Sequence, residues 1–209
     1  MELEIIVPYK RDSSAREKNR EMFESHWQDY NYKIVEDYDE RSIAYNKAAR
    51  DSKADVIALG DIDALIFPDQ ILEAMRYFKF RGADLVYPFD HIINIYRDKK
   101  DPIRWPNYYT LGLFPMFKRE SFLAMGGENE NFVGYGWEDF ERYFRALNHD
   151  YKIERVDGPA YHMDHGWRSR KGNPHIRNNW ELMKNERDKF ENRINDGSYV
   201  RPRIAKSRS

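Results

Sequence analysis

Cysteine is missing altogether from this 209-residue sequence. Its absence excludes disulfide scaffolds, cysteine nucleophiles, iron–sulfur clusters and zinc sites built on cysteine. An excess of charge of either sign is missing as well, because 35 Lys and Arg residues stand against 36 Asp and Glu residues, a net charge of −1. Since general nucleic-acid binding needs a basic footprint, this balance argues against nucleic acid as a partner.

Long apolar runs are also lacking. The longest apolar run is well short of the length that a membrane-spanning helix needs, about 18 residues. The chain begins with a strand-like segment, MELEIIVPYK, instead of an export signal. We therefore expect no stable insertion into a membrane. With 41% apolar and 15% aromatic residues, the chain nevertheless has the material for a packed core.

The order of apolar patterns predicts an α/β fold, with a mostly parallel central sheet flanked by helices. We expect one domain over residues 1–197, ending in an amphipathic helix, and a basic tail over residues 198–209. A capping box at Ser14 and Glu17 predicts the start of the first helix. Residues 91–106 show no assignable pattern. Strands are predicted at residues 3–7, 32–38, 56–59, 84–87 and 111–118, and later helices from about residues 42, 68, 120, 138 and 176.

Asp61 and Asp63 follow the predicted strand at residues 56–59, at the edge where open α/β sheets bind ligands. Alternate residues of an extended segment point the same way, so both carboxylates can face one cation such as Mg²⁺ or Mn²⁺. A polar turn without a metal is the plainer interpretation. A second Asp-x-Asp at residues 37–39 shows how weak the pattern is alone.

His162 and His165 form a second candidate site, directly after a predicted strand. Two imidazoles with one carboxylate favour Mn²⁺ over Mg²⁺, because nitrogen ligands suit borderline metals. Ordinary surface or core histidines are the alternative.

Glu138 and Asp139 open a predicted helix behind a glycine-rich loop. Acids at that position often serve only as partners of the helix dipole. The functional alternative is a general base, with the loop closing over a substrate. Lys10 and Arg11 follow the first strand at the same sheet edge, where they would contact a diphosphate or simply lie in solvent.

Taken in order, these segments resemble the catalytic domain of the β-1,4-galactosyltransferase family, whose members are GT-A fold glycosyltransferases. The resemblance is carried by IIVPYKRD, by residues 41–46 together with residues 60–63, by GYGWEDFE, and by the segment from His162 to His165. It implies a single GT-A, Rossmann-like domain. Trp137 stands where the family has a glycine and Tyr135 where it has a mobile tryptophan, so the identities of donor and acceptor do not carry over.

The resemblance also implies residue roles. Asp139 matches the catalytic base, and Glu138 matches the acid that orients donor or acceptor. Asp63 and His165 match ligands of Mn²⁺, with Mg²⁺ as the alternative ion, and His162 takes the place of a third ligand. The residues that it places around the nucleotide sugar are Pro8, Tyr9, Lys10, Arg11, Arg41, Asp61, Tyr135 and Trp137.

The implied function is an inverting, metal-dependent transfer of a sugar from a nucleotide-diphosphate sugar, by expectation a UDP-sugar, to a hydroxyl of a glycan or another acceptor. The loop at residues 132–137 would close over the donor. Two alternatives stay open, a nucleotidyltransferase and a non-catalytic, metal-dependent carbohydrate-binding protein. The first normally needs a glycine-rich phosphate loop, and PYKRDSSAR contains no glycine. Lacking an anchor and cysteine, the chain is expected to be a cytoplasmic protein of a bacterium or virus.

Overall fold

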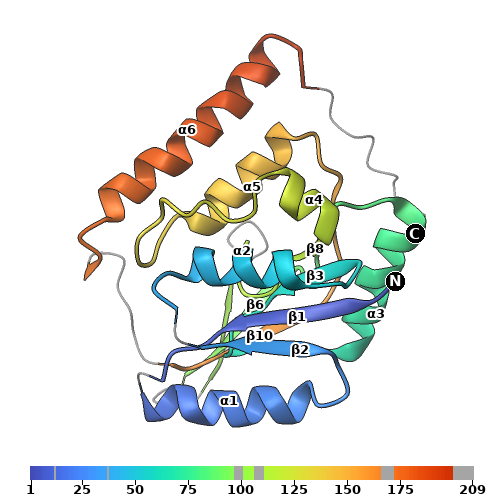
Figure 1. The fold of residues 1–209 in the computed structure, drawn as a ribbon, viewed down its shortest axis with the longest axis vertical. Coiled ribbons are helices and arrows are strands. Elements are labelled where there is room, and N and C mark those ends of the chain that lie inside the picture. Colours follow the sequence, from blue (N-terminus) through green and yellow to red (C-terminus); the bar gives the residue numbers. More distant parts are fainter. Residues whose placement is uncertain (12, 37, 97–100, 106–110, 166–171, 200–209) are drawn as a thin grey trace.

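The computed structural model describes residues 1–11, 13–36, 38–96, 101–105, 111–165 and 172–199. Helices and strands alternate up to the third strand, and beyond it several strands follow one another directly (Figure 1). In chain order they are β1 (Leu3–Pro8), α1 (Ser14–His26), β2 (Tyr32–Val35), α2 (Arg41–Asp51), β3 (Val56–Leu59), β4 (Ala64–Ile66), α3 (Pro68–Arg76), the π-helical turn η1 (Tyr77–Arg81), β5 (Leu85–Tyr87), β6 (His91–Ile95), β7 (Ile103–Trp105), β8 (Met116–Lys118), α4 (Arg119–Ala124), α5 (Glu138–Asn148), β9 (Ile153–Arg155), β10 (Pro159–Met163) and α6 (Ile176–Asn195).

Six strands form the main sheet, in the order β2-β1-β3-β8-β5-β9. β1 is parallel to β2 and β3, and β5 is parallel to β9, whereas β8 runs antiparallel to both of its neighbours. The helices α1 and α2 lie on opposite faces of β1 and β2 (Figure 1). The predicted α/β fold with a mostly parallel, helix-flanked sheet is therefore confirmed.

Burial explains why the first strands were visible in the sequence. Ile5, Ile6 and Val7 of β1 are fully buried, and every residue of β3 is buried. A strand covered by helices on both faces needs a continuous apolar run. On the α1 side, the ring of Trp27 stacks on Phe114 with centroids 5.1 Å apart.

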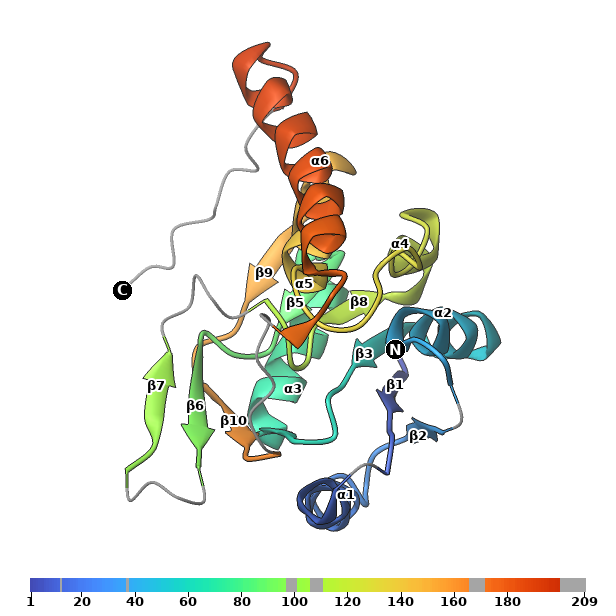
Figure 2. The same ribbon diagram turned by 90° about the vertical axis from the view of Figure 1, so that its left-hand side faces the viewer.

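A second sheet, which the sequence did not predict, stands beside the first (Figure 2). Its strand order is β4-β10-β6-β7, with β10 antiparallel to β4 and parallel to β6. Its strands are only three to five residues long, and β6 and β7 fall in the unassigned residues 91–106. Such short strands carry little periodic signal, because they contain too few residues for an alternation to show.

The start of α1 differs from the prediction by one residue. The N-cap is Ser13, with extended backbone angles, and its Oγ accepts a hydrogen bond from the Arg16 N–H at 3.3 Å. The predicted capping box at Ser14 and Glu17 was therefore misplaced, because Ser14 is already helical. The second strand likewise ends at Val35 and does not continue to residue 38.

The predicted strand at residues 111–118 is reduced to β8. Leu113 has a φ of 65°, and the Phe114 N–H donates to the Gly112 carbonyl at 2.9 Å. This is a tight three-residue turn, which an extended strand cannot contain.

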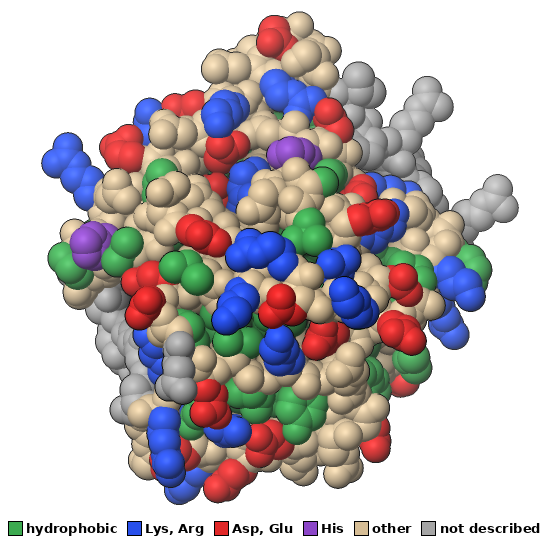
Figure 3. Space-filling model, viewed as in Figure 1, with side chains coloured by type: hydrophobic (Ala, Val, Ile, Leu, Met, Phe, Trp, Pro, Cys, Tyr) green, Lys and Arg blue, Asp and Glu red, His purple; other side chains and the backbone are tan. Residues whose placement is uncertain are grey.

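Charge is evenly mixed on the face shown in Figure 3, where basic and acidic side chains are interspersed. None of the helices in the described part of the chain combines the length and apolar character that crossing a bilayer requires. The basic residues of the predicted tail lie outside the described residues; they are Arg201, Arg203, Lys206 and Arg208.

Candidate functional site

Asp63 is brought to the predicted histidines by strand pairing. It lies directly before β4, and in the antiparallel pair of β4 with β10 Ala64 faces His162. The ladder continues one step further, because the Met163 N–H donates to the Asp63 carbonyl at 2.8 Å. Backbone hydrogen bonds therefore place a carboxylate and two imidazoles from distant parts of the chain at one point.

The spacing of these three side chains suits a shared cation. Asp63 Oδ1 lies 3.8 Å from His162 Nε2, and Asp63 Oδ2 lies 3.5 Å from His165 Nε2. One ligand atom from each residue lies within 4.8 Å of the others. These separations are too long for hydrogen bonds, but they match donor atoms that share one ion at bond lengths of about 2.1 Å. We call Asp63, His162 and His165 the metal trio.

Burial makes this arrangement costly unless a cation completes it. The Asp63 side chain is only 3% exposed, and in the described part of the chain no Lys or Arg forms an ion pair with it. A buried carboxylate is normally paired or bound to a metal. The metal trio, one carboxylate and two imidazoles, therefore fits a borderline divalent ion such as Mn²⁺.

The orientation of the His162 ring supports the same conclusion. His162 Nδ1 lies 2.8 Å from Oδ1 of the buried Asn94, placed next to it by the parallel pairing of β6 and β10. Because that amide oxygen only accepts, Nδ1 carries the proton and Nε2 turns its lone pair toward Asp63. His165 also turns Nε2 toward Asp63, whereas its Nδ1 is buried without a hydrogen-bond partner among the described residues.

Asp61, the first acid of the Asp-x-Asp segment, faces a different cation. Arg41 Nη2 lies 3.0 Å from Asp61 Oδ1. Burial lowers the pKa of Arg41, but the negative charges of Asp61, Glu138 and Asp139 outweigh burial and raise this pKa well above its ordinary value. The Arg41 side chain is 38% exposed, so it remains accessible to an anionic ligand.

Glu138 and Asp139 form the first turn of α5, as predicted, but their environments differ. Glu138 Oε2 accepts the Gly136 N–H at 2.6 Å. Burial, together with the negative charge of Asp139, raises the pKa of Glu138 to about 7. Asp139 Oδ1 instead accepts a hydrogen bond from Arg142 Nη2 at 2.6 Å. We call Glu138 and Asp139 the acid pair.

The tight turn at residues 112–114 connects the acid pair to the Asp-x-Asp segment. A Cβ added at Gly112 would lie 2.6 Å from Asp139 Oδ2, so any other residue here would displace the Asp139 carboxylate. The carbonyl of Leu113 accepts the Asp61 N–H at 2.9 Å. Asp61 and Asp139 therefore contact two consecutive residues of the same turn.

The loop expected to close over a donor is docked on α6. Asn173 Nδ2 donates to two carbonyl oxygens of residues 132–137, at 3.0 and 2.9 Å, and the buried Asn179 donates to one at 3.1 Å. The ring of Trp137, whose φ is 76°, meets Trp180 edge-on at a centroid distance of 4.7 Å. Contacts to α6 and to Asn173, which precedes that helix, thus hold the loop in place; its closing movement stays a prediction.

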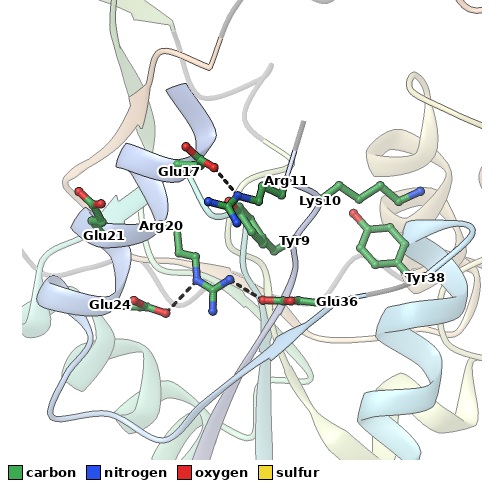
Figure 4. Close-up of a pocket in the computed structure, with 9 residues that line it drawn as sticks. All are labelled: Tyr9, Lys10, Arg11, Glu17, Arg20, Glu21, Glu24, Glu36 and Tyr38. Carbon is green, nitrogen blue, oxygen red and sulfur yellow. Dashed lines mark hydrogen bonds and ion pairs between the residues drawn. The ribbon is translucent and has the colours of Figure 1, made fainter. Parts of the chain in front are cut away.

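Four of the residues predicted to contact the nucleotide lie at the end of β1 and in the turn that follows it. Pro8 and Tyr9 are buried, whereas Lys10 and Arg11 are exposed. Arg11 pairs with Glu17, and Lys10 Nζ donates to a backbone carbonyl at 3.0 Å. A cavity of about 690 Å³ opens beside them (Figure 4). It is lined by Tyr9, Lys10, Arg11, Glu17, Arg20, Glu21, Glu24, Glu36 and Tyr38.

The remaining predicted contacts of the nucleotide sugar do not line this cavity. Arg41 and Asp61 pair with each other, Tyr135 is 44% exposed in the loop docked on α6, and Trp137 packs against that helix. The structure therefore divides the predicted nucleotide residues between the end of β1, the start of α2, the segment between β3 and β4, and the loop before α5.

Sequence reasoning missed two residues that contact the predicted ones, Asn94 and Arg142. Asn94 shares the buried face of the segment HIINI with the apolar Ile92, so a polar residue two positions after an apolar one was the available signal. Arg142 follows Asp139 by three positions on a helix, the spacing at which side chains meet.

Comparison with known proteins agrees with this architecture. A family model described as the N-terminal domain of galactosyltransferase matches residues 91–166, just over a third of the chain. No curated protein matches the sequence.

Three solved structures share the fold. A mutant of Drosophila β1,4-galactosyltransferase 7 in complex with manganese, UDP-Gal and xylobiose is 19% identical at a TM-score of 0.55, over 74% of this chain and 65% of that one. Staphylococcus aureus TarS in complex with UDP-GlcNAc is 12% identical at a TM-score of 0.63, over 89% of this chain and 66% of that one. The mannosyltransferase PcManGT from Pyrobaculum calidifontis, in complex with GDP-Man and Mn²⁺, is 15% identical at a TM-score of 0.51, over 92% of this chain and 75% of that one.

These similarities show that the chain has the fold of GT-A glycosyltransferases, and they confirm the predicted resemblance to β-1,4-galactosyltransferases. The chain spans slightly less than two thirds of the length of the first two structures.

Proposed function

We propose that this protein transfers a sugar from a nucleotide-diphosphate sugar to an acceptor hydroxyl in a reaction that depends on a divalent metal. The observation that carries the proposal is the metal trio, whose ligand atoms lie within 4.8 Å of one another. Asp63 belongs to the same Asp-x-Asp segment as Asp61. The Asp61 N–H donates to Leu113 in the turn at residues 112–114, and the Asp139 carboxylate lies against Gly112 of the same turn.

The structures of similar fold support the choice of ligands. The galactosyltransferase structure holds manganese and UDP-Gal, the TarS structure holds UDP-GlcNAc, and the mannosyltransferase structure holds GDP-Man and Mn²⁺. We propose Mn²⁺ as the ion, with Mg²⁺ as the alternative, and a UDP-sugar as the donor. Bound at the metal trio, the ion would neutralise the departing diphosphate as a Lewis acid. Arg41, partly exposed beside Asp61, would add a second positive charge near that group.

Asp139 is proposed as the base. Its Oδ1 is held by Arg142, while its side chain is 30% exposed, so a hydroxyl can reach the carboxylate. Asp139 would take the proton as the acceptor oxygen attacks the anomeric carbon from the face opposite the diphosphate. A single displacement of this kind inverts the anomeric configuration.

Glu138 would have a different role. With a pKa of about 7, it carries a proton in about half of the molecules at neutral pH. A protonated carboxyl donates a hydrogen bond, which suits orientation of a sugar hydroxyl better than removal of its proton.

The experiment is to incubate the protein with UDP-Glc, UDP-Gal, UDP-GlcNAc and GDP-Man, with Mn²⁺, with Mg²⁺ or with EDTA, and to measure release of the nucleoside diphosphate. We expect release from at least one UDP-sugar, abolished by EDTA and restored by Mn²⁺. An isosteric Asp139→Asn variant serves as the control that binds the donor without turning it over. Metal-dependent donor binding without release from any of the four would contradict a transferase and favour a binding protein.

A further inference from the structure

Arg142 is a buried cation that joins the acid pair to the interior. It lies one turn beyond Asp139 on α5, and its side chain is 3% exposed. Nη1 donates to both carboxylate oxygens of Glu128, at 3.1 and 3.0 Å. Nη2 donates to the Leu111 carbonyl at 3.0 Å and to Asp139 Oδ1 at 2.6 Å. One guanidinium therefore connects a buried carboxylate to a partly exposed one.

The buried end of this connection is fixed by the backbone. The Glu128 N–H donates to Asn46 Oδ1 at 2.7 Å, and Asn46 Nδ2 donates back to the Glu128 carbonyl at 2.8 Å. Asn46 is 3% exposed, and a Cβ at Gly127 would lie 2.2 Å from its Oδ1. Glu128 is therefore clamped to α2, and the planar fork of Arg142 is held with it.

On the basis of the proposed transferase function, we infer that Arg142 is a positioning residue for Asp139. It fixes the carboxylate through Oδ1 and leaves Oδ2 to accept the proton of the acceptor hydroxyl. Arg142 thereby decides which member of the acid pair acts as the base.

The asymmetry of the acid pair supports this role. Two neighbouring carboxylates disfavour simultaneous ionisation. Arg142 donates a hydrogen bond to Asp139, whereas Glu138 accepts one from a backbone N–H. Burial raises the pKa of Glu138 to about 7. Environments that separate two titratable groups in this way assign different proton roles to them.

A purely structural ion pair is the competing explanation, and α5 offers a matched control for it. One turn further along, Arg145 Nε pairs with Glu141 Oε1 at 3.0 Å, with side chains 12% and 2% exposed. Arg145 also donates to the carbonyls of Met125 and Gly127. This second pair is buried in the same helix, but it has no contact with the acid pair among the interactions of the described residues.

The test compares two double variants. Arg142→Gln alone would leave Glu128 buried without its cation, which is strongly destabilising. We therefore replace both partners, as Glu128→Gln/Arg142→Gln, and make Glu141→Gln/Arg145→Gln as the control. We expect the first to lower kcat by about 100-fold, with the donor KM changed by less than about threefold. The control should lower the melting temperature but leave kcat unchanged.

The split between kcat and KM separates positioning from general destabilisation. The control should keep the wild-type kcat and donor KM although its melting temperature is lower. A Glu128→Gln/Arg142→Gln variant with wild-type kcat would overturn the inference while leaving the proposed function intact.

A second measurement does not depend on turnover. Asp139→Asn should lower the melting temperature of the wild type by a few degrees, yet change that of Glu128→Gln/Arg142→Gln by less than about one degree, because the partner is already gone. Equal shifts in both backgrounds would overturn the ion pair itself. If the wild type releases no nucleoside diphosphate from any donor, the proposed function fails, and this cycle still reports on Arg142 and Asp139.

Discussion

The metal trio and the acid pair are assembled by different interactions. Asp63 and His162 meet because β10 pairs with β4, and Asn94 reaches His162 because β10 also pairs with β6. The acid pair depends on side-chain charge, since Asp139 is held by Arg142. Strand pairing uses backbone groups that every residue carries, whereas a buried ion pair requires each of its members.

This contrast has a practical consequence. Substitutions around the metal trio should change metal affinity and leave the proton chemistry alone. Substitutions around the acid pair should change proton transfer and its pH dependence, and leave metal affinity alone. The predictions below test whether the two parts of the site are separable in this way.

The largest effect is expected for Asp139→Asn. Removing the general base should lower kcat by about 10²- to 10⁴-fold, while the affinity for Mn²⁺ stays within about twofold of the wild type. Steady-state transfer assays and calorimetric titration with Mn²⁺ measure the two quantities. Near-normal transfer by a variant that binds donor would show that Asp139 is not the base.

A smaller effect is expected for Asn94→Ala, which removes the hydrogen bond to His162 Nδ1. Loss of such a supporting contact typically lowers metal affinity by about 10- to 100-fold. Asn131→Ala is the matched control, because Asn131 is an exposed residue whose hydrogen bonds go to Asn129. The kcat at saturating Mn²⁺ should not change. A lowered kcat at saturating Mn²⁺ with unchanged Mn²⁺ affinity would contradict the separation of the two parts.

The smallest effect is expected for Glu138→Gln, and it concerns stability. The pKa of Glu138 rises from its ordinary value of 4.5 to about 7 on folding, so between these values the folded state binds more protons than the unfolded state. Stability of the wild type should therefore fall as pH rises through this window. Glu138→Gln should melt a few degrees above the wild type at pH 8 and at the same temperature at pH 4.5.

Glu120→Gln is the control for this comparison, because Glu120 also lies in the first turn of a helix but is exposed. It should show no pH-dependent difference. Parallel melting curves for the wild type and Glu138→Gln across pH 4.5 to 8 would mean that Glu138 is not held in its protonated form.

Sequence patterns predicted the parts of the molecule that local physics decides. β1 and β3 are buried on both faces, which demands continuous apolar runs, and the start of α5 is marked by acids after glycines. The candidate ligands were also found, because carboxylates and imidazoles are recognisable by type. The roles of Asp63, His162, His165 and Asp139 stay predictions until they are measured.

The parts that were missed depend on features that local sequence patterns do not show. β6 and β7 are short, and β6 acquires its place by pairing with the distant β10 as well as with its neighbour β7. The positive φ of Leu113 interrupts a run that is apolar enough to be a strand. Arg142 lies in the predicted helix from residue 138, and only the fold shows that it is buried between Glu128 and Asp139.

The central claim, that the metal trio holds the ion on which transfer depends, is tested most directly by calorimetric titration of Mn²⁺ into the wild type and into the isosteric Asp63→Asn variant, each with UDP present. The account predicts one Mn²⁺ bound per wild-type chain and an affinity at least about 100-fold lower in the variant, with no release of nucleoside diphosphate at the same Mn²⁺ concentration. Equal affinity for Mn²⁺ in the two proteins would contradict it.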